Sequence, residues 1–225
     1  MGSKNKLKRF AENDVFSNVI QPKRHEVING FHLAGKWNTH FNNDYPIVLE
    51  LGCGKGEYTI ELARRHPETN YIGIDIKGAR LWRGAKTAIE EGLENVAFLR
   101  TQIELIDRLF TAKEVSEIWI TFPDPQIKYK RTKHRLTNAS FLKKYEAILK
   151  PKGIIHLKTD SAFMHGYTLG LLHGMDYEVL YANHDIYKNA GSPREVLEIQ
   201  TFYENQYLKA NKPITYIQFR PTLTQ

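Results

Sequence analysis

The sequence contains few of the residues that would point to an exported protein. Its single cysteine, Cys53, excludes an internal disulfide and suits a reducing compartment. No run of residues is long and apolar enough to cross a membrane, and the first ten residues, MGSKNKLKRF, carry charge without an apolar stretch behind them. We therefore expect a soluble protein that stays in the cytoplasm and has no membrane partner.

Motifs for metal ions and for phosphate-rich nucleotides are also missing. The nine histidines are scattered, and no group of His, Cys, Asp and Glu has the spacing of zinc ligands, so we expect no metal. The chain lacks the GxxxxGK[ST] loop of Walker-type sites. Its glycine-rich stretch LELGCGKGEYT does not match the GxGxxG dinucleotide fingerprint, because Glu57 stands where the third glycine belongs.

Apolar runs and helical patterns alternate along most of the chain. We expect strands at 47–52, 70–75, 95–100, 117–122 and 154–160, and helices at 57–67, 78–92, 103–110, 138–150 and 163–173. Asn138 is a plausible N-cap for the fourth helix and Pro151 its stop. This alternation predicts an α/β, Rossmann-like sheet, mostly parallel, with helices on both faces. Strands at 177–182 and 214–219 break the alternation and predict an antiparallel edge.

Length and composition favour one large domain. The chain has 225 residues, of which 41% are apolar, and this is enough for a single core. Residues 1–45 are polar and weakly periodic, so we expect a basic N-terminal arm with a short helix. Residues 46–225 are then expected to form the folded domain.

Positive charge is concentrated in one block. The net charge is +7, but from Lys128 to Lys158 ten Lys or Arg residues face one acid, Glu146, so this block carries +9 and the remainder −2. A smaller cluster contains Lys4, Lys6, Lys8 and Arg9. Such a block is either a solvated basic face or a footprint for a polyanion, most plausibly nucleic acid.

The glycine loop and the acids around it form a cofactor pattern. Three glycines follow the first strand, Glu50 precedes them, and Asp75 ends the second strand; the glycines are Gly52, Gly54 and Gly56. Glycine lets the backbone approach a ligand, and an acid after the second strand can hold a ribose diol. The combination resembles the class I S-adenosylmethionine-dependent methyltransferases. Cys53 lies inside this loop, where we expect a packing residue rather than a nucleophile.

The fourth strand ends in TFPDPQIKYKRTKHRLT, in which Pro123 and Pro125 flank Asp124. The prolines restrict the backbone and so limit the direction of the carboxylate. Together with LELGCGKG, YIGID, LKTD and TFYE, in that order, this stretch resembles the bacterial tRNA (guanine-N7-)-methyltransferases. The resemblance covers about residues 45–220.

The resemblance implies methyl transfer from S-adenosyl-L-methionine to N7 of a guanine in the variable loop of tRNA. It makes Asp124 the catalytic residue and a cofactor contact, and it assigns further cofactor contacts to Glu50, Gly52, Gly54, Gly56, Asp75 and Gln102. Substrate contacts fall on Lys128, Asp160, Thr201, Phe202, Tyr203 and Glu204. The remaining RNA contacts fall on Lys130, Arg131, Lys133, His134 and Arg135.

Two positions depart from the family pattern. Gln102 stands where relatives carry Asp or Asn, and Gln126 replaces the Trp of the usual Pro-Asp-Pro-Trp motif. Two other functions stay open, namely methylation of an exocyclic amine on RNA or DNA, and non-catalytic RNA binding. We expect tRNA as the partner and no obligate protein partner, with either a monomer or a homodimer.

Overall fold

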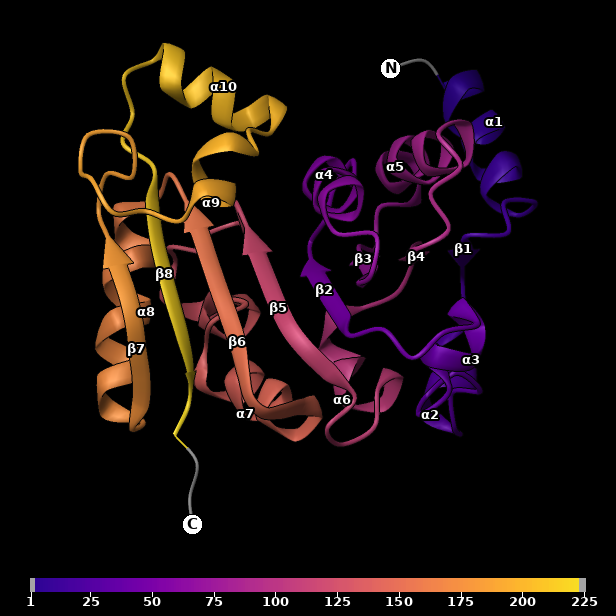
Figure 1. Ribbon diagram of the computed structural model, residues 1–225, viewed down its shortest axis with the longest axis horizontal. Coiled ribbons are helices and arrows are strands. Elements are labelled where there is room, and N and C mark those ends of the chain that lie inside the picture. The colour runs from indigo at the N-terminus through magenta and orange to yellow at the C-terminus, as the bar shows by residue number, and fades with distance from the viewer. Residues whose placement is uncertain (1–2, 223–225) are drawn as a thin grey trace.

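In the computed structural model, which describes residues 3–222, the seven predicted strands and one short additional strand form one eight-stranded sheet (Figure 1). Its order is β1-β4-β3-β2-β5-β6-β8-β7. The five parallel strands predicted from apolar runs are β2 (Ile47–Leu51), β3 (Asn70–Ile74), β4 (Val96–Leu99), β5 (Val115–Thr121) and β6 (Leu149–Thr159). The antiparallel edge is confirmed, because β8 (Thr215–Pro221) pairs with both β6 and β7 (Tyr177–Asn183).

Helices cover both faces of the sheet, as the alternation predicted. Successive side chains along each strand point to opposite faces of the sheet and belong to two separate hydrophobic cores. Leu49 and Ile72 belong to the core beneath α6 (Ile106–Leu109), α7 (Ala139–Ile148) and α8 (Ala162–Gly174). Val48 and Tyr71 belong to the core beneath α4 (Glu57–Arg65) and α5 (Gly78–Glu90).

Strand order reverses at β2, which lies between β3 and β5. Loops that leave neighbouring parallel strands on opposite faces open a crevice at the carboxyl edge of such a sheet. The glycine loop follows β2, Asp75 follows β3, Asp124 follows β5 and Asp160 follows β6. The fold therefore brings the predicted cofactor and catalytic segments to one edge.

The N-terminal segment is more ordered than an arm with one short helix. It contains α1 (Ser3–Asn13), α2 (Arg24–Ile28), α3 (Trp37–Phe41) and the short strand β1 (Val19–Ile20), which pairs with β4. Helix α1 lies against α5 (Figure 1), and the Asn13 Nδ2 atom donates to the Gly78 carbonyl at 2.9 Å. Polar contacts of this kind leave no hydrophobic periodicity, so the sequence pattern did not reveal them. The side chain of Lys4 lies outside the described residues.

The predicted N-cap and stop signals can be compared with the observed ends of α7. Asn138 is the N-cap of α7, since its side chain accepts a hydrogen bond of 2.9 Å from the Phe141 amide. The helix ends at Ile148, before Pro151, and the proline lies within β6. The segment after β7 contains two short helices that the sequence did not predict, α9 (Arg194–Glu198) and α10 (Phe202–Lys209).

Candidate active site

The glycine loop between β2 and α4 is the open part of the carboxyl edge. Gly52 and Gly54 have φ angles of 77° and 58°, and a Cβ on either would meet no atom beyond the adjacent residues closer than 3.9 Å. A ligand can therefore lie close to the backbone at these two positions, while the Gly52 amide itself donates to the Ile74 carbonyl at 2.8 Å. Gly56 differs, because a Cβ there would lie 2.6 Å from the Phe98 ring. That glycine lets α4 pack on the sheet.

Asp75 braces the loop from the neighbouring strand. One of its carboxylate oxygens accepts a hydrogen bond of 2.9 Å from the Gly54 amide, and the other accepts one of 2.7 Å from the Lys77 amide. Each oxygen retains a further lone pair, since a carboxylate oxygen accepts about two hydrogen bonds. A ribose diol next to this loop would therefore find both acceptors already fixed in place.

Glu50 lies beneath the loop and is only 3% exposed. Its carboxyl accepts hydrogen bonds from the amide and the hydroxyl of Thr59 in α4, and from the Thr121 hydroxyl in β5 at 2.6 Å. Burial raises the pKa of Glu50 to about 7, although hydrogen bonds from both threonines act in the opposite direction. In this structure Glu50 positions the loop from below.

Gln102 lies at the mouth of a smaller cavity of about 340 Å³, whose lining includes Ile76 and Leu105. The Arg24 guanidinium donates to its side-chain oxygen. Ile76 follows Asp75 directly and is 53% exposed, so it offers a bare apolar surface beside the carboxylate. The remaining lining is largely polar, so Ile76 and Leu105 supply the apolar surface, and Gln102 the amide, that a purine base would use here.

The Cys53 thiol and the metal-ligating types of side chain also bear on the chemistry of the site. Cys53 is buried, and burial raises the pKa of its thiol well above the usual range, so it is a packing residue and a poor nucleophile. Within residues 3–222, no group of three or more His, Cys, Asp or Glu side chains is placed to hold a metal ion.

The loop after β5 holds Asp124 at the surface. Phe122 and Gln126 have φ angles of 47° and 48°, so the chain turns sharply on both sides of the acid. One carboxylate oxygen of Asp124 accepts a hydrogen bond of 3.0 Å from the Gln126 amide. Pro123 and Pro125 fix the intervening φ angles. Asp124 is exposed, and its second oxygen faces no donor among the described residues.

Arg135 holds the same loop from inside, and sequence reasoning had placed it on RNA. It is only 5% exposed, and its guanidinium donates to the Gln126 and Ile127 carbonyls at 3.1 to 3.2 Å. It also lies over the rings of Phe163 and Tyr167, at 4.8 and 4.5 Å from their centroids. Arg135 is therefore an internal clamp, because its donors are directed into the protein.

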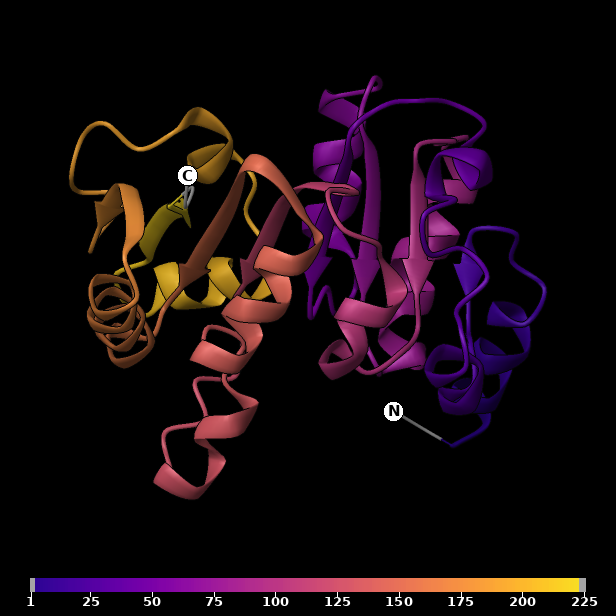
Figure 2. The same cartoon turned by 90° about the horizontal axis from the view of Figure 1, so that it is seen from below.

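Most of the remaining basic run forms the short 3-10 helix η2 (Tyr129–His134), which contains no buried residue. Figure 2 shows this segment, between β5 and α7, projecting from the body of the molecule. Four cations on it and at its N-cap are exposed to solvent: Lys128, Lys130, Arg131 and Lys133. Tyr129, which follows the N-cap, is 93% exposed. His134 lies nearer the body, with Nδ1 at 3.8 Å from a Glu104 carboxylate oxygen.

The TFYE segment forms the start of α10. Thr201 and Glu204 make a capping box, and Phe202 and Tyr203 between them are 50% and 43% exposed. Glu204 has no exposed surface and forms an ion pair of 2.7 Å with Lys158, which is equally buried. Sequence reasoning missed Lys158, since nothing in LKTD distinguishes an inward lysine from a solvated one.

Two contacts place α10 beside the glycine loop. The Phe202 amide donates to a Glu57 carboxylate oxygen at 2.8 Å, and the Lys55 ammonium lies 4.3 Å from the centre of the Phe202 ring. Asp160, at the end of β6, is partly exposed and faces Lys212 at 3.8 Å. The predicted substrate residues therefore reach the carboxyl edge, with Glu204 buried behind it.

The chain matches the family model Methyltransf_4, whose description is "Putative methyltransferase", over residues 44–217. A tRNA (guanine-N(7)-)-methyltransferase from Christiangramia forsetii is 72% identical over 98% of this chain and 99% of its own length. One from Porphyromonas gingivalis is 53% identical over 85% of this chain and 78% of its own length.

Solved structures agree on the fold. The 16S rRNA methyltransferase KamB superposes with a TM-score of 0.62 at 14% identity, covering 82% of this chain and 91% of its own. A structure of an antibiotic-related methyltransferase gives a TM-score of 0.61 at 17% identity, over 84% of this chain and 94% of its own. With a Rossmann-like methyltransferase fold and relatives this similar, the chain belongs to the tRNA (guanine-N(7)-)-methyltransferase family.

Proposed function

We propose that this protein transfers a methyl group from S-adenosylmethionine to N7 of a guanine in the variable loop of tRNA, with Asp124 as the catalytic residue. The observation that carries the proposal is the meeting of three parts at one sheet edge. These are the open glycine loop braced by Asp75, the acid held between two prolines, and the exposed cations of η2.

The side chains around the loop fit the proposed cofactor. Gly52 and Gly54 have no Cβ, so the methionyl part of the cofactor would lie directly against the backbone of the loop. Asp75 would hold the ribose hydroxyls, and Ile76 with Gln102 would hold adenine. When bound, S-adenosylmethionine supplies an electrophilic methyl group on a sulfonium. Glu50 acts at one remove, by fixing the loop through Thr59.

Asp124 then acts on the guanine. Attack by the N7 lone pair on the methyl group that S-adenosylmethionine would supply would leave a positive charge on the purine, which the Asp124 carboxylate would face. Because N7 carries no proton, the transfer needs no base, and alignment and electrostatics supply the rate. The free oxygen of Asp124 would accept hydrogen bonds from N1–H and the amino group, which adenine cannot offer. Its charge also stabilises the cationic product.

Contacts to the RNA come from the exposed residues of the predicted set. Lys128, Lys130, Arg131 and Lys133 would meet phosphates, His134 lies at the edge of this surface, and Asp160, Phe202 and Tyr203 border the guanine. Thr201 and Glu204 would position the substrate residues indirectly, because they cap α10 and Glu204 anchors that helix to Lys158. No helix of the described residues is long and apolar enough to cross a membrane. We propose a cytoplasmic enzyme without an obligate protein partner, as a monomer or homodimer.

A labelling assay tests the reaction and its target atom. Purified protein is incubated with methyl-labelled S-adenosylmethionine and an unmodified tRNA transcript, which is then cleaved chemically at N7-methylguanosine. We expect label on the tRNA and strand cleavage in the variable loop. A matched transcript containing 7-deazaguanosine, which lacks N7, should take up no label. Label without cleavage would indicate an exocyclic amine, and absence of label would overturn the proposal.

A further inference from the structure

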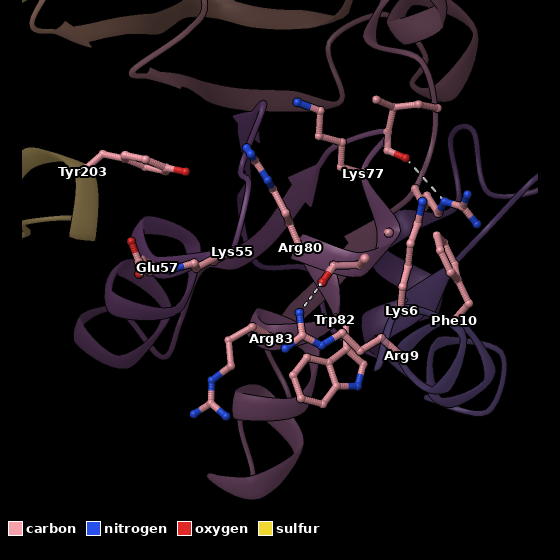
Figure 3. A pocket seen from close by; sticks show the side chains of 14 residues that line it. Lys6, Arg9, Phe10, Lys55, Glu57, Lys77, Arg80, Trp82, Arg83 and Tyr203 are labelled. Atoms are coloured by element: carbon pink, nitrogen blue, oxygen red, sulfur yellow. Dashed lines mark hydrogen bonds and ion pairs between the residues drawn. The ribbon is translucent and has the colours of Figure 1, made fainter. Parts of the chain in front are cut away.

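A basic cleft of about 1100 Å³ lies beside the glycine loop and the start of α5 (Figure 3). Its walls come from α1, the loop after β2 with the start of α4, the first half of α5 and the start of α10. Seven Lys or Arg residues line it against one acid, Glu57; they are Lys6, Arg9, Lys55, Lys77, Arg80, Arg83 and Arg100. None of them belongs to the +9 block between Lys128 and Lys158.

The stability of the fold does not account for the cations at the start of α5. Lys77 is the N-cap of α5, and Arg80 and Arg83 lie in its first two turns, where the helix has no acidic residue. Cations at this end oppose the helix dipole, which favours negative charge there. Among residues 3–222, no carboxylate oxygen lies within 4.0 Å of the Lys77 or Arg80 side-chain nitrogen atoms. The arrangement costs stability until an anion binds.

The proposed cofactor does not supply that anion either. S-adenosylmethionine carries a positive sulfonium and no phosphate, so it cannot neutralise Lys77 and Arg80 together with the cations around them. The ligand of the cleft must instead carry several negative charges. A polyphosphate backbone meets this requirement.

The floor of the cleft holds two of its arginines on aromatic rings. The Arg9 guanidinium lies 4.5 Å from the centre of the Trp82 ring, and that of Arg100 lies 4.5 Å from the centre of Phe10. Arg9 also donates to the Ala79 carbonyl at 3.2 Å and Arg100 to the Gln21 side-chain oxygen at 3.0 Å, so these two arginines hold the cleft walls together and keep positive charge at its floor. In Figure 3, Arg80 and Lys77 extend from α5 into the open cleft, and the hydroxyl of Tyr203 points toward them from α10.

We propose that this cleft binds the phosphodiester backbone of a second segment of the tRNA, away from the target guanine. The inference rests on the proposed function and adds a second RNA surface to it. Only β2 separates β3, which leads into the cleft, from β5, which leads to Asp124 and η2. Neighbouring strands are about 4.8 Å apart, so the two strand ends lie about 10 Å from each other. One RNA can therefore contact both surfaces across the cofactor site.

The test neutralises Arg80 and Arg83 together, as R80Q/R83Q, because both are exposed and neither forms an ion pair within 4.0 Å among the described residues. The matched control is K150Q/K152Q, which removes the same charge at the amino end of β6, away from the cleft. The dissociation constant for tRNA is measured from 50 to 500 mM KCl on protein loaded with S-adenosylhomocysteine. Thermal melting and affinity for S-adenosylhomocysteine report on folding.

For R80Q/R83Q we expect the dissociation constant for tRNA to rise about 10- to 30-fold near 150 mM salt. The slope of its logarithm against log[KCl] should fall by about 1.4 to 1.8, which corresponds to two lost phosphate contacts. The KM for tRNA should rise more than kcat falls, and the control should change neither quantity.

An unchanged affinity and slope in R80Q/R83Q, or an equal loss in K150Q/K152Q, would overturn the second RNA surface while leaving methylation by the wild type intact. A wild type that binds tRNA with this salt slope but transfers no label would instead refute the proposed reaction alone. The two proposals therefore fail separately.

Discussion

Asp124 and Arg135 have different roles in the loop after β5: Asp124 presents a carboxylate at the surface, and Arg135 holds the loop from inside the protein. Asp124 is exposed and receives one hydrogen bond, from the Gln126 amide. Arg135 is buried and places its donors on the carbonyls of Gln126 and Ile127. Gln126 is thus held on both sides, and its side-chain oxygen accepts from Arg131 at 3.0 Å. The residue that replaces the family's Trp is an anchor of the loop.

Replacing Asp124 with Asn separates charge from geometry. Asn can still accept the hydrogen bond from the Gln126 amide, so the loop should keep its shape. We expect kcat/KM for tRNA methylation to fall about 10²- to 10³-fold, because a fixed charge that acts on the developing cation is lost. The melting temperature should not change, and affinity for S-adenosylhomocysteine should fall much less than kcat/KM, because Asn keeps an oxygen acceptor at the cofactor contact. Asp44→Asn, at another exposed acid, is the control, and activity near that of the wild type in Asp124→Asn would refute the catalytic role.

Arg135→Gln and Arg131→Gln should affect different quantities. The first leaves two carbonyls without donors and removes the contacts with Phe163 and Tyr167, so we expect a loss of about 1 to 3 kcal/mol in the free energy of unfolding. Arg131 is exposed, so its replacement should cost less than about 0.5 kcal/mol and should weaken tRNA binding instead. Denaturant unfolding and tRNA titrations measure the two effects. Equal stability of both variants would contradict the clamp.

The Pro-Asp-Pro stretch and its basic run could be read from the sequence because their residues are contiguous. The burial of Arg135 could not, since it depends on two aromatic residues of α8 about 30 positions later. A lysine or arginine inside a basic run looks the same to sequence analysis whether it faces RNA or the core. Only packing against a distant helix distinguishes the two cases.

At the scale of elements, two buried acids connect segments that the sequence keeps apart. Glu50 in β2 receives donors from α4 and β5. Glu204 in α10 pairs with Lys158 in β6 and accepts from the Tyr187 hydroxyl at 2.7 Å. The buried strands were predictable because each is a continuous apolar run. The two-residue β1 and the short helices near the C-terminus were not, since they are too short to show a period.

Removing one partner of the Lys158–Glu204 ion pair should lower the unfolding free energy more than replacing both partners with uncharged residues. Lys158→Met leaves a buried carboxylate without its cation, and we expect a loss of about 3 to 5 kcal/mol in unfolding free energy. The double variant Lys158→Met/Glu204→Gln should recover at least half of that loss. Lys212→Met, which removes the exposed cation beside Asp160, is the control and should change little. A double variant as unstable as the single one would contradict the charge pairing.

Glu50 predicts a pH dependence of stability. Its pKa is raised by burial from 4.5 to about 7, so between these pH values the folded protein binds the proton that the unfolded chain releases. The resulting stabilisation is complete below pH 4.5 and is lost as pH rises through 7. Relative to Glu50→Gln, the wild type should therefore lose about 2 to 3 kcal/mol between pH 5 and pH 8. If the unfolding free energies of the two proteins changed equally with pH across this range, Glu50 would not be a buried acid that is neutral in the folded state.

At the scale of the whole molecule, two basic surfaces flank the cofactor edge, and they come from different parts of the chain. The surface on η2 is one contiguous run and was visible as charge in the sequence. The cleft combines α1, the loop after β2 and α5, so its residues appeared unrelated until the sheet placed them together. The docking of α1 on α5 also makes residues that looked like an arm into one wall of that cleft.

If both surfaces hold one tRNA, their contributions to salt-dependent binding should add. The variant K130Q/R131Q/K133Q removes three exposed cations of η2, and we expect the slope of log Kd against log[KCl] to fall by about 2 to 2.7. Combining it with R80Q/R83Q should lower the slope by the sum of the separate changes, because the two groups of cations lie on different elements and share no partner. Titrations of one tRNA against all three variants, with K150Q/K152Q as the charge control, measure this. A combined variant no weaker than K130Q/R131Q/K133Q alone would show that the cleft does not contact the RNA held by η2.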